Sequence, residues 1–255
     1  LLDAFNEITS SGKAQVILTT HTPNLARKIQ RESLRFITKN EADVPEILYG
    51  TEDTTLKNIK DALGILADHD VKLFVGVEGK WDIEFFKRIS KILNVADTTI
   101  PCLASAEKSG YLVFIPLGGS SMELWTSRIA ELNRPEFYIT DRDTVPPALP
   151  AYQAHIDDWN ARDNCSALCT SKRELENYLH PTAIQHYLPN FPNTIADFDD
   201  VPATYGQLKG IRSKNAKKIL NQGVVDKMTP ALLAESDPNG DITTILRTIA
   251  THLAN

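Results

Sequence analysis

The sequence has little of what marks a secreted or membrane-spanning protein. Its three cysteines, Cys102, Cys165 and Cys169, are an odd number without the spacing of a disulfide framework, which indicates a reducing compartment. Cys165 and Cys169 also lack the companion ligands that zinc requires, so we expect them to be small core residues. No apolar run approaches the ~20 residues that cross a bilayer, and the first residues lack the pattern of a signal peptide. These absences predict a cytoplasmic protein with no membrane partner.

Basic residues are too few to give the whole surface a positive charge. The chain has 27 lysines and arginines against 33 aspartates and glutamates, for a net charge of −6. This balance excludes a uniformly basic nucleic-acid-binding surface but not a local basic patch. The 255 residues, 42% of them apolar, are enough for one large domain or two smaller ones with a sizeable core.

The first 70 residues combine a strand-turn-helix pattern with a polar connection. Residues 1–8 already have the pattern of the middle of an amphipathic helix, so we expect the chain to be a fragment of a longer one. The β-branched run at 14–20 predicts a strand that leads to His21, with a helix after it. The next expected elements are a strand at 33–38, a polar connection at 41–55 and a helix at 56–67. A domain boundary is expected between residues 40 and 70.

From residue 72 onward, predicted strands and helices alternate. The strands are expected at 72–77, 113–117, 136–140 and 167–170, and the helices at 81–93 and 122–132. Such alternation predicts right-handed crossovers and a parallel α/β sheet. Ligands of such sheets bind at the carboxyl ends of the strands. The last seventy or so residues are mostly helical in pattern and predict a smaller helical subdomain.

Two carboxylates follow the apolar strand at 136–140. Asp141 and Asp143 are one residue apart, and in an extended chain both would point to the same side. Adjacent carboxylates repel each other and take up protons unless a cation neutralises them, so the pair predicts a divalent cation. Glu78, followed by Gly79, ends the strand at 72–77. We expect it at the same edge of the sheet.

Further carboxylates extend this acidic set. Asp82 lies four residues after Glu78 in the first turn of the next helix, where it is equally compatible with a helix-start residue stabilised by the helix dipole. Glu174 and Glu176 follow the short strand at 167–170, and either is also compatible with an exposed helix-start charge. Oxygen ligands of this kind suit Mg²⁺ or Mn²⁺ rather than zinc.

This acidic set resembles the Toprim domain of the OLD (overcoming lysogenisation defect) family of nucleases. The motifs that carry the resemblance are Glu78-Gly79 with Asp82, Asp141-Arg142-Asp143, and the sequence Arg-Glu-Leu-Glu-Asn-Tyr-Leu at 173–179. In addition, residues 16–23 (VILTTHTP) resemble the last core strand and switch histidine of the ABC-type ATPase domain that precedes Toprim in this family. The likeness covers roughly residues 1–180.

The resemblance implies a Toprim-like sheet, DNA as a partner and a two-metal endonuclease centre. It divides the chain into the end of an ATPase domain (1–45), a catalytic Toprim domain (46–180) and a helical subdomain (181–255). The expected ligands of two Mg²⁺ or Mn²⁺ ions are Glu78, Asp82, Asp141, Asp143 and Glu176. Asp141 would bridge the two ions. Glu78 and Asp82 would bind one ion, and Asp143 and Glu176 would bind the other. Glu176 is preferred to Glu174 because the family's motif places the acid directly before Asn-Tyr.

The resemblance also implies a catalytic lysine, a homodimer and a role in phage defence. The densest basic run lies at 208–218, where Lys214 is the expected catalytic residue and Lys217 and Lys218 are the alternatives. As a second possibility, this run is an exposed helix face that binds the DNA backbone. ATP would act only in a full-length protein, because residues 11–14 lack most of a phosphate-binding loop. We expect no ATPase activity from this chain.

Two other functions stay open from the sequence. Asp141-Arg142-Asp143-Thr144 also fits the first motif of haloacid-dehalogenase-like phosphatases, with Asp141 as covalent nucleophile and Asp143 as acid or base. Asp199 and Asp200 would then supply late metal ligands, but Glu78 and its helix would have no role. The other alternative is a Toprim module that binds DNA or a partner without catalysis, which has no need of so many carboxylates.

Overall fold

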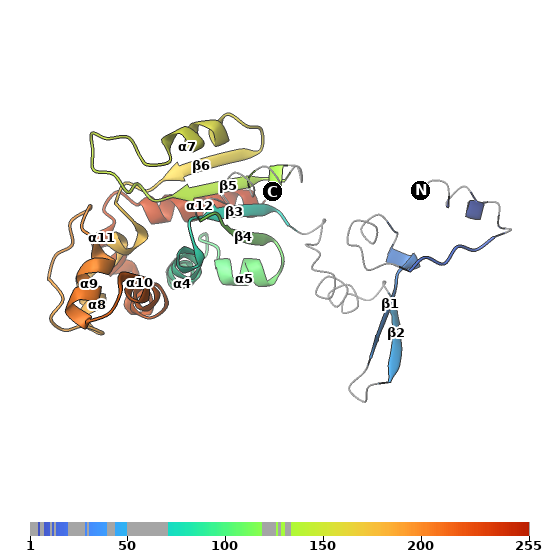
Figure 1. The fold of residues 1–255 in the computed structure, drawn as a ribbon, viewed down its shortest axis with the longest axis horizontal. Helices are drawn as coiled ribbons and strands as arrows, with labels where there is room; N and C mark the ends of the chain where they lie inside the picture. Colours follow the sequence, from blue (N-terminus) through green and yellow to red (C-terminus); the bar gives the residue numbers. More distant parts are fainter. Residues whose placement is uncertain are drawn as a thin grey trace. The chain divides into compact units, whose positions relative to one another are not determined.

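The structure, a computed structural model, describes residues 71–118 and 134–254 without a gap. The other described residues are 5, 8–10, 12, 14–19, 29, 31–39, 44–49, 126, 129 and 130. The chain divides into two units, Leu1–His69 and Asp70–Asn255, which we treat separately (Figure 1). His21, the helix expected at 56–67 and most of the helix expected at 122–132 lie outside the described residues.

The described part of the first unit contains an antiparallel hairpin. Strand β1 (Arg35–Lys39) follows the short 3-10 helix η1 (Arg31–Ser33) and pairs with β2 (Pro45–Tyr49), with Ile37 opposite Ile47. The strand expected at 33–38 is thus confirmed as β1, but the polar connection expected at 41–55 is wrong where it contains β2. The apolar run within β2 is only a few residues long, so the sequence did not predict a strand there. Its pairing with β1 forms the strand.

The strand expected at 14–20 is absent from the described residues 14–19. Its β-branched residues favour an extended backbone, but a strand also needs a hydrogen-bonded neighbour. Among the residues that the structure describes, none pairs with this segment as a strand.

The second unit is built on a four-stranded parallel sheet. Its strands are β3 (Leu73–Val77), β4 (Leu112–Pro116), β5 (Glu136–Thr140) and β6 (Cys165–Cys169). They lie side by side in the order β4-β3-β5-β6, and every pairing is parallel (Figure 1). The predicted α/β class with a parallel sheet is confirmed. The order makes β3 and β5 central neighbours, which decides where the acidic residues meet.

Helices flank this sheet, and most of them follow the last strand (Figure 1). They are α4 (Lys80–Ala96), α5 (Leu103–Lys108), α7 (Gln153–Asn160), η3 (Leu175–Tyr178), α8 (Pro181–Gln185), α9 (Val201–Lys209), α10 (Ser213–Gln222), η4 (Val224–Lys227), α11 (Pro230–Ser236) and α12 (Asp241–Ala254). None of the helices that the structure describes has the length and apolar character of a membrane span.

Alternate strand residues fill two apolar cores, one on each face of the sheet. Leu73, Val75 and Val77 of β3 join the larger core, which also contains residues of α4, α10 and α12. Phe74 of β3 belongs to the smaller core, which contains Trp159 of α7. The helices after residue 180 lie in the same unit as the sheet, and α10 packs against both α4 and α9. The helical region is therefore a structural part of the sheet unit.

Gly76 of β3 allows the two central strands to pack closely. A Cβ atom at this position would lie 2.3 Å from Cδ1 of Tyr138 and 2.9 Å from Cδ1 of Leu117. The Tyr138 ring has little room to move, because it stacks on Trp159 with 4.3 Å between ring centroids and its hydroxyl donates to Glu136. Glycine at this position is a requirement of the packing.

Gly76→Ala should therefore lower the free energy of unfolding by about 1–3 kcal/mol, the usual cost of overpacking a core. Urea denaturation followed by circular dichroism measures this change. Gly79→Ala is the matched control, since a Cβ atom there would meet nothing within 4 Å. A loss of stability as large in Gly79→Ala as in Gly76→Ala would contradict the packing argument.

Candidate functional site

The carboxyl ends of β3 and β5 bring two acidic residues together. Glu78 directly follows β3 and Asp141 directly follows β5. The backbone N–H of Asp141 donates to Oε1 of Glu78 at 3.1 Å. This meeting at one edge of the sheet is the arrangement that the sequence predicts, and it results from the direct pairing of β3 with β5.

Asp82 both caps α4 and belongs to the same acidic group. Its Oδ2 accepts a hydrogen bond of 2.8 Å from the N–H of Gly79, the residue before the helix. Its side chain is nevertheless buried, with 8% of the residue exposed. The negative charge of Asp82 also raises the pKa of both Glu78 and Asp141. Asp82 is thus a helix-start residue that also lies among the other carboxylates, and its role as a metal ligand stays a prediction.

Glu174 and Glu176 enter the group from the segment after β6. Glu174 precedes η3 and Glu176 lies within it, and both are buried, with 7% and 1% exposed. Both carboxylates face Lys217 of α10, whose Nζ lies 2.7 Å from Oε2 of Glu174 and 3.8 Å from Oε2 of Glu176. The structure therefore brings both candidates of the sequence motif to the site. We call Glu78, Asp82, Asp141, Glu174 and Glu176 the acidic cluster.

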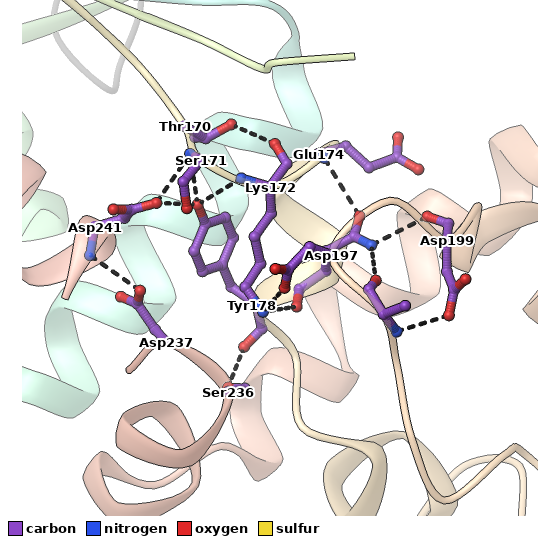
Figure 2. Close-up of polar contacts among 12 residues, drawn as sticks. Thr170, Ser171, Lys172, Glu174, Tyr178, Asp197, Asp199, Ser236, Asp237 and Asp241 are labelled. Atoms are coloured by element: carbon purple, nitrogen blue, oxygen red, sulfur yellow. Dashed lines mark hydrogen bonds and ion pairs between the residues drawn. The ribbon is translucent and has the colours of Figure 1, made fainter. Parts of the chain in front are cut away.

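A polar network holds the segment that carries these two glutamates (Figure 2). The Tyr178 hydroxyl accepts hydrogen bonds from the N–H groups of Ser171 and Lys172 and donates to Oδ2 of Asp241. Ser236 donates to the carbonyl oxygen of Tyr178 at 2.7 Å, and Lys172 Nζ lies 2.8 Å from Oδ1 of Asp197. Tyr178 thus joins η3 to the helices near the end of the chain.

Helix α10 presents one face to the acidic cluster. Lys214, Lys217 and Asn221 follow each other at helical spacing and become progressively more buried, from exposed through half-buried to fully buried. Nδ2 of Asn221 donates to Oε1 of Glu176 at 2.6 Å. Its Oδ1 is buried and has no hydrogen-bond partner among the described residues.

The lysine that lies in the cluster is Lys217, whereas Lys214 is the one expected from the sequence. Lys214 and Lys218 are exposed, and within the described ranges no ion pair joins either of them to a carboxylate. The choice among the three depends on which face of α10 packs against α4 and η3, and this contact is tertiary. The geometry thus places the alternative Lys217, and not Lys214, beside the carboxylates.

Asp143 does not have the extended conformation expected from the sequence. Its φ is +58°, a left-handed conformation that is uncommon outside glycine but is tolerated by aspartate. Its N–H donates to the carbonyl oxygen of Arg173 at 2.9 Å, and the residue is exposed. Its charge still raises the pKa of Glu78. Asp143 therefore lies at the exposed edge of the acidic cluster, without the burial of Asp141.

Burial and mutual repulsion raise the pKa values within the acidic cluster. Burial raises the pKa of Glu78 to about 7 and that of Asp82 to about 6. Burial also raises the pKa of Glu176 to about 8, against the opposing charge of Lys217. The pKa of Asp141 is raised well above its usual value by burial and then by Glu78, Asp82 and Glu176. If all its carboxyls were ionised, the cluster would hold more negative charge than one ammonium group offsets.

The pKa of Lys217 is also set by burial and by the neighbouring charges, but here the charges together have the larger effect. Burial alone would lower its pKa, but the charges of Glu176 and Glu174 more than compensate and raise it. Lys217 is therefore protonated over the whole physiological pH range.

The donors suit a hard divalent cation, although they do not form a closed ligand shell. Asp141 is 5% exposed, and its carboxylate receives no hydrogen bond or ion pair from the described residues. A buried carboxylate of this kind normally has a partner. Within the described residues, no three His, Cys, Asp or Glu side chains are arranged as a ready-made metal site. A cation would thus draw the side chains of the acidic cluster closer together.

Tyr152 and Asn221 are residues of the site that the sequence did not reveal. The charge of Glu78 and then burial raise the pKa of the Tyr152 phenol, with added effects from Asp143 and Asp141. Tyr152, just before α7, therefore lies within range of the charges of the acidic cluster. Neither residue belongs to a motif, and only the position of Asn221 one turn after Lys217 is a signal that the sequence contains.

Comparison of the chain with protein-family models, curated proteins and solved structures gave no match. The function of the chain is therefore inferred from the geometry and chemistry of the acidic cluster.

The raised pKa values predict how the stability of the metal-free protein depends on pH. A carboxyl group whose pKa is higher in the folded state adds stability below its unfolded pKa and loses it as pH rises through the folded value. For Glu176 the loss extends from about pH 4.5 to about pH 8. Glu176→Gln should therefore raise the free energy of unfolding at pH 8 by about 1–4 kcal/mol and flatten its fall between pH 5 and 8.

Urea denaturation at several pH values, after dialysis against a chelator, measures this effect. Asp163→Asn, at an exposed aspartate outside the acidic cluster, controls for the loss of one negative charge. If Glu176→Gln is less stable than the wild type at pH 8, the contacts of Glu176 with Lys217 and Asn221 outweigh the cost of burying its charge.

Proposed function

We propose that this protein is a divalent-metal-dependent endonuclease that hydrolyses phosphodiester bonds in DNA. One observation carries the proposal: Asp141, buried at the end of a central strand and without a partner of its own, lies among further carboxylates. Such an arrangement is stable at neutral pH when a cation joins it. The resemblance of the motifs to OLD-family Toprim domains agrees with this reading, and so does the parallel sheet.

The carboxylates nearest to Asp141 would hold the metal. Glu78 and Asp82 are the neighbours whose charges most affect it, and all three supply the oxygen ligands that Mg²⁺ and Mn²⁺ prefer. A bound ion would neutralise the scissile phosphate and lower the pKa of a water molecule. Lys217, with its raised pKa, supplies a permanent positive charge for the phosphoryl oxygens. The reaction adds one water across a P–O bond and leaves a phosphate and a hydroxyl end.

The exposed part of α10 offers a route for the DNA backbone to this centre. Arg212, just before α10, and Lys214 and Lys218 within it are exposed, and Lys217 lies on the same helix between these two lysines. A short basic face of this kind binds phosphates without reading the base sequence. In the proposed function Lys214 is therefore a backbone contact. The homodimer, the ATP dependence of a full-length protein and the role in phage defence stay predictions.

The phosphatase alternative gains no support from the late aspartates. Asp199 Oδ2 accepts from the N–H of Ala196 at 2.7 Å, which closes a local turn. Asp200 caps α9 through the N–H of Ala203 and pairs with Arg173 at 3.1 Å. Both carboxylates therefore have structural partners. The acidic cluster contains Glu78 and Asp82 instead, which the phosphatase motif does not use.

Asp141→Asn should reduce the nicking of supercoiled plasmid in Mg²⁺ or Mn²⁺ by about 100-fold or more, because it removes a buried ligand charge while keeping the shape of the side chain. Agarose-gel assays measure cleavage, and circular dichroism confirms that the variant folds. Asp157→Asn, at an exposed aspartate of α7, is the control and should nick as the wild type does.

A small phosphomonoester, tested in parallel, separates nuclease from phosphatase. The nuclease leaves it intact, whereas a phosphatase hydrolyses it and loses this activity in Asp141→Asn. Undiminished nicking by Asp141→Asn would refute the proposed function.

Lys214→Ala should weaken DNA binding about 3- to 10-fold at low salt and reduce the slope of log affinity against log salt concentration by about one. At saturating DNA the cleavage rate should change little. Fluorescence anisotropy with a labelled duplex gives the affinity, and single-turnover cleavage gives the rate. If only the cleavage rate falls, Lys214 has the catalytic role expected from the sequence and is not a backbone contact.

A further inference from the structure

Helix α10 supplies partners to one half of the acidic cluster and not to the other. Lys217 contacts Glu174 at 2.7 Å and Glu176 at 3.8 Å. Asn221, one turn further along the same helix, donates to the other oxygen of Glu176 at 2.6 Å. The two carboxylates that follow β6 thus have an ammonium group and an amide from the protein itself.

The other half of the cluster accepts hydrogen bonds only from the backbone, although the charge of Lys217 also acts on its three carboxylates at longer range. Glu78 accepts from the N–H of Asp141 and Asp82 accepts from the N–H of Gly79. The Asp141 carboxylate has no hydrogen bond or ion pair among the described residues, although the residue is 5% exposed. Within the described ranges, no Lys or Arg forms an ion pair with any of these three. This half therefore has the stronger need of a foreign cation.

A second divalent ion at Glu176 would meet the Lys217 ammonium, which lies 3.8 Å from its Oε2. Two positive centres that share the same carboxylate oxygens repel each other strongly in a partly buried site. Asp143, the other ligand expected for that ion, is exposed and in a left-handed conformation. Asn221 also occupies an oxygen of Glu176 that such an ion would need. The amide oxygen of Asn221 is buried without a partner, which shows that its side chain is oriented toward Glu176 by this one hydrogen bond.

We propose that Lys217 takes the place of a second divalent ion, so that the site binds one Mg²⁺ or Mn²⁺ at Glu78, Asp82 and Asp141. The inference rests on the proposed function and replaces the two-metal centre expected from the sequence, in which Asp143 and Glu176 were ligands of the second ion. Glu174 and Glu176 then act on Lys217: they hold its ammonium group beside the metal-binding half of the cluster. Asn221 is a positioning residue that orients Glu176.

The number of bound ions tests this directly. The purified protein, stripped with a chelator and dialysed to pH 8, is titrated with Mn²⁺ by calorimetry, and the free ion is counted by its electron paramagnetic resonance signal. The wild type should bind one Mn²⁺ per chain. Lys217→Met, which keeps the length of the side chain but removes its charge, should bind a second ion. Lys218→Met, exposed on the same helix, is the matched control and should bind one.

Two further variants keep the test decisive if Lys217→Met fails to fold. Glu176→Gln should still bind one Mn²⁺, because its carboxylate serves Lys217, whereas Asp141→Asn should bind at least tenfold more weakly than the wild type. Two ions on the wild type, or the loss of an ion in Glu176→Gln, would overturn the inference and leave a metal nuclease in place. No Mn²⁺ on the wild type at millimolar concentration would overturn the proposed function as well.

Discussion

Mutual repulsion among buried carboxylates is the constraint on which the rest of the site depends. The strand order of the sheet forces Glu78 and Asp141 to the same edge, and Asp82 and Glu176 are close enough to raise the pKa of Asp141 further. Burying charge without compensation is costly. The backbone N–H groups of Gly79 and Asp141, the ammonium of Lys217 and the amide of Asn221 each remove part of that cost.

This constraint also explains why the helices after residue 180 belong to the same unit as the sheet. Helix α10 carries Lys217 and Asn221 into the cluster, and α11 and α12 hold the segment of Glu174 and Glu176 through Ser236 and Asp241. The parallel sheet alone would gather the acids but could not balance them. The helical region is therefore part of the site's electrostatics.

Features that depend on a short sequence pattern or on the order of the strands could be predicted from the sequence. The apolar run before Asp141 is β5 at its predicted bounds, and parallel pairing places Glu78 beside it. Prediction from the sequence failed where the outcome depends on tertiary packing or on a single backbone angle. The choice of Lys217 over Lys214 depends on which face of α10 is buried, and the φ of +58° at Asp143 has no signature in an Asp-Arg-Asp motif. Tyr152 reaches the cluster only through the fold.

The Tyr178 hydroxyl links the segment after β6 to Asp241, some sixty residues further along the chain. During synthesis on a ribosome, the sheet strands and Glu78, Asp82, Asp141, Glu174 and Glu176 all emerge well before Asp241. Until that residue is available, the segment of Glu174 and Glu176 lacks its anchor, and until α10 emerges the acids lack Lys217. The nascent chain would thus carry its full set of acids before the groups that order them, so any activity of the cluster is delayed until the helical region has been made.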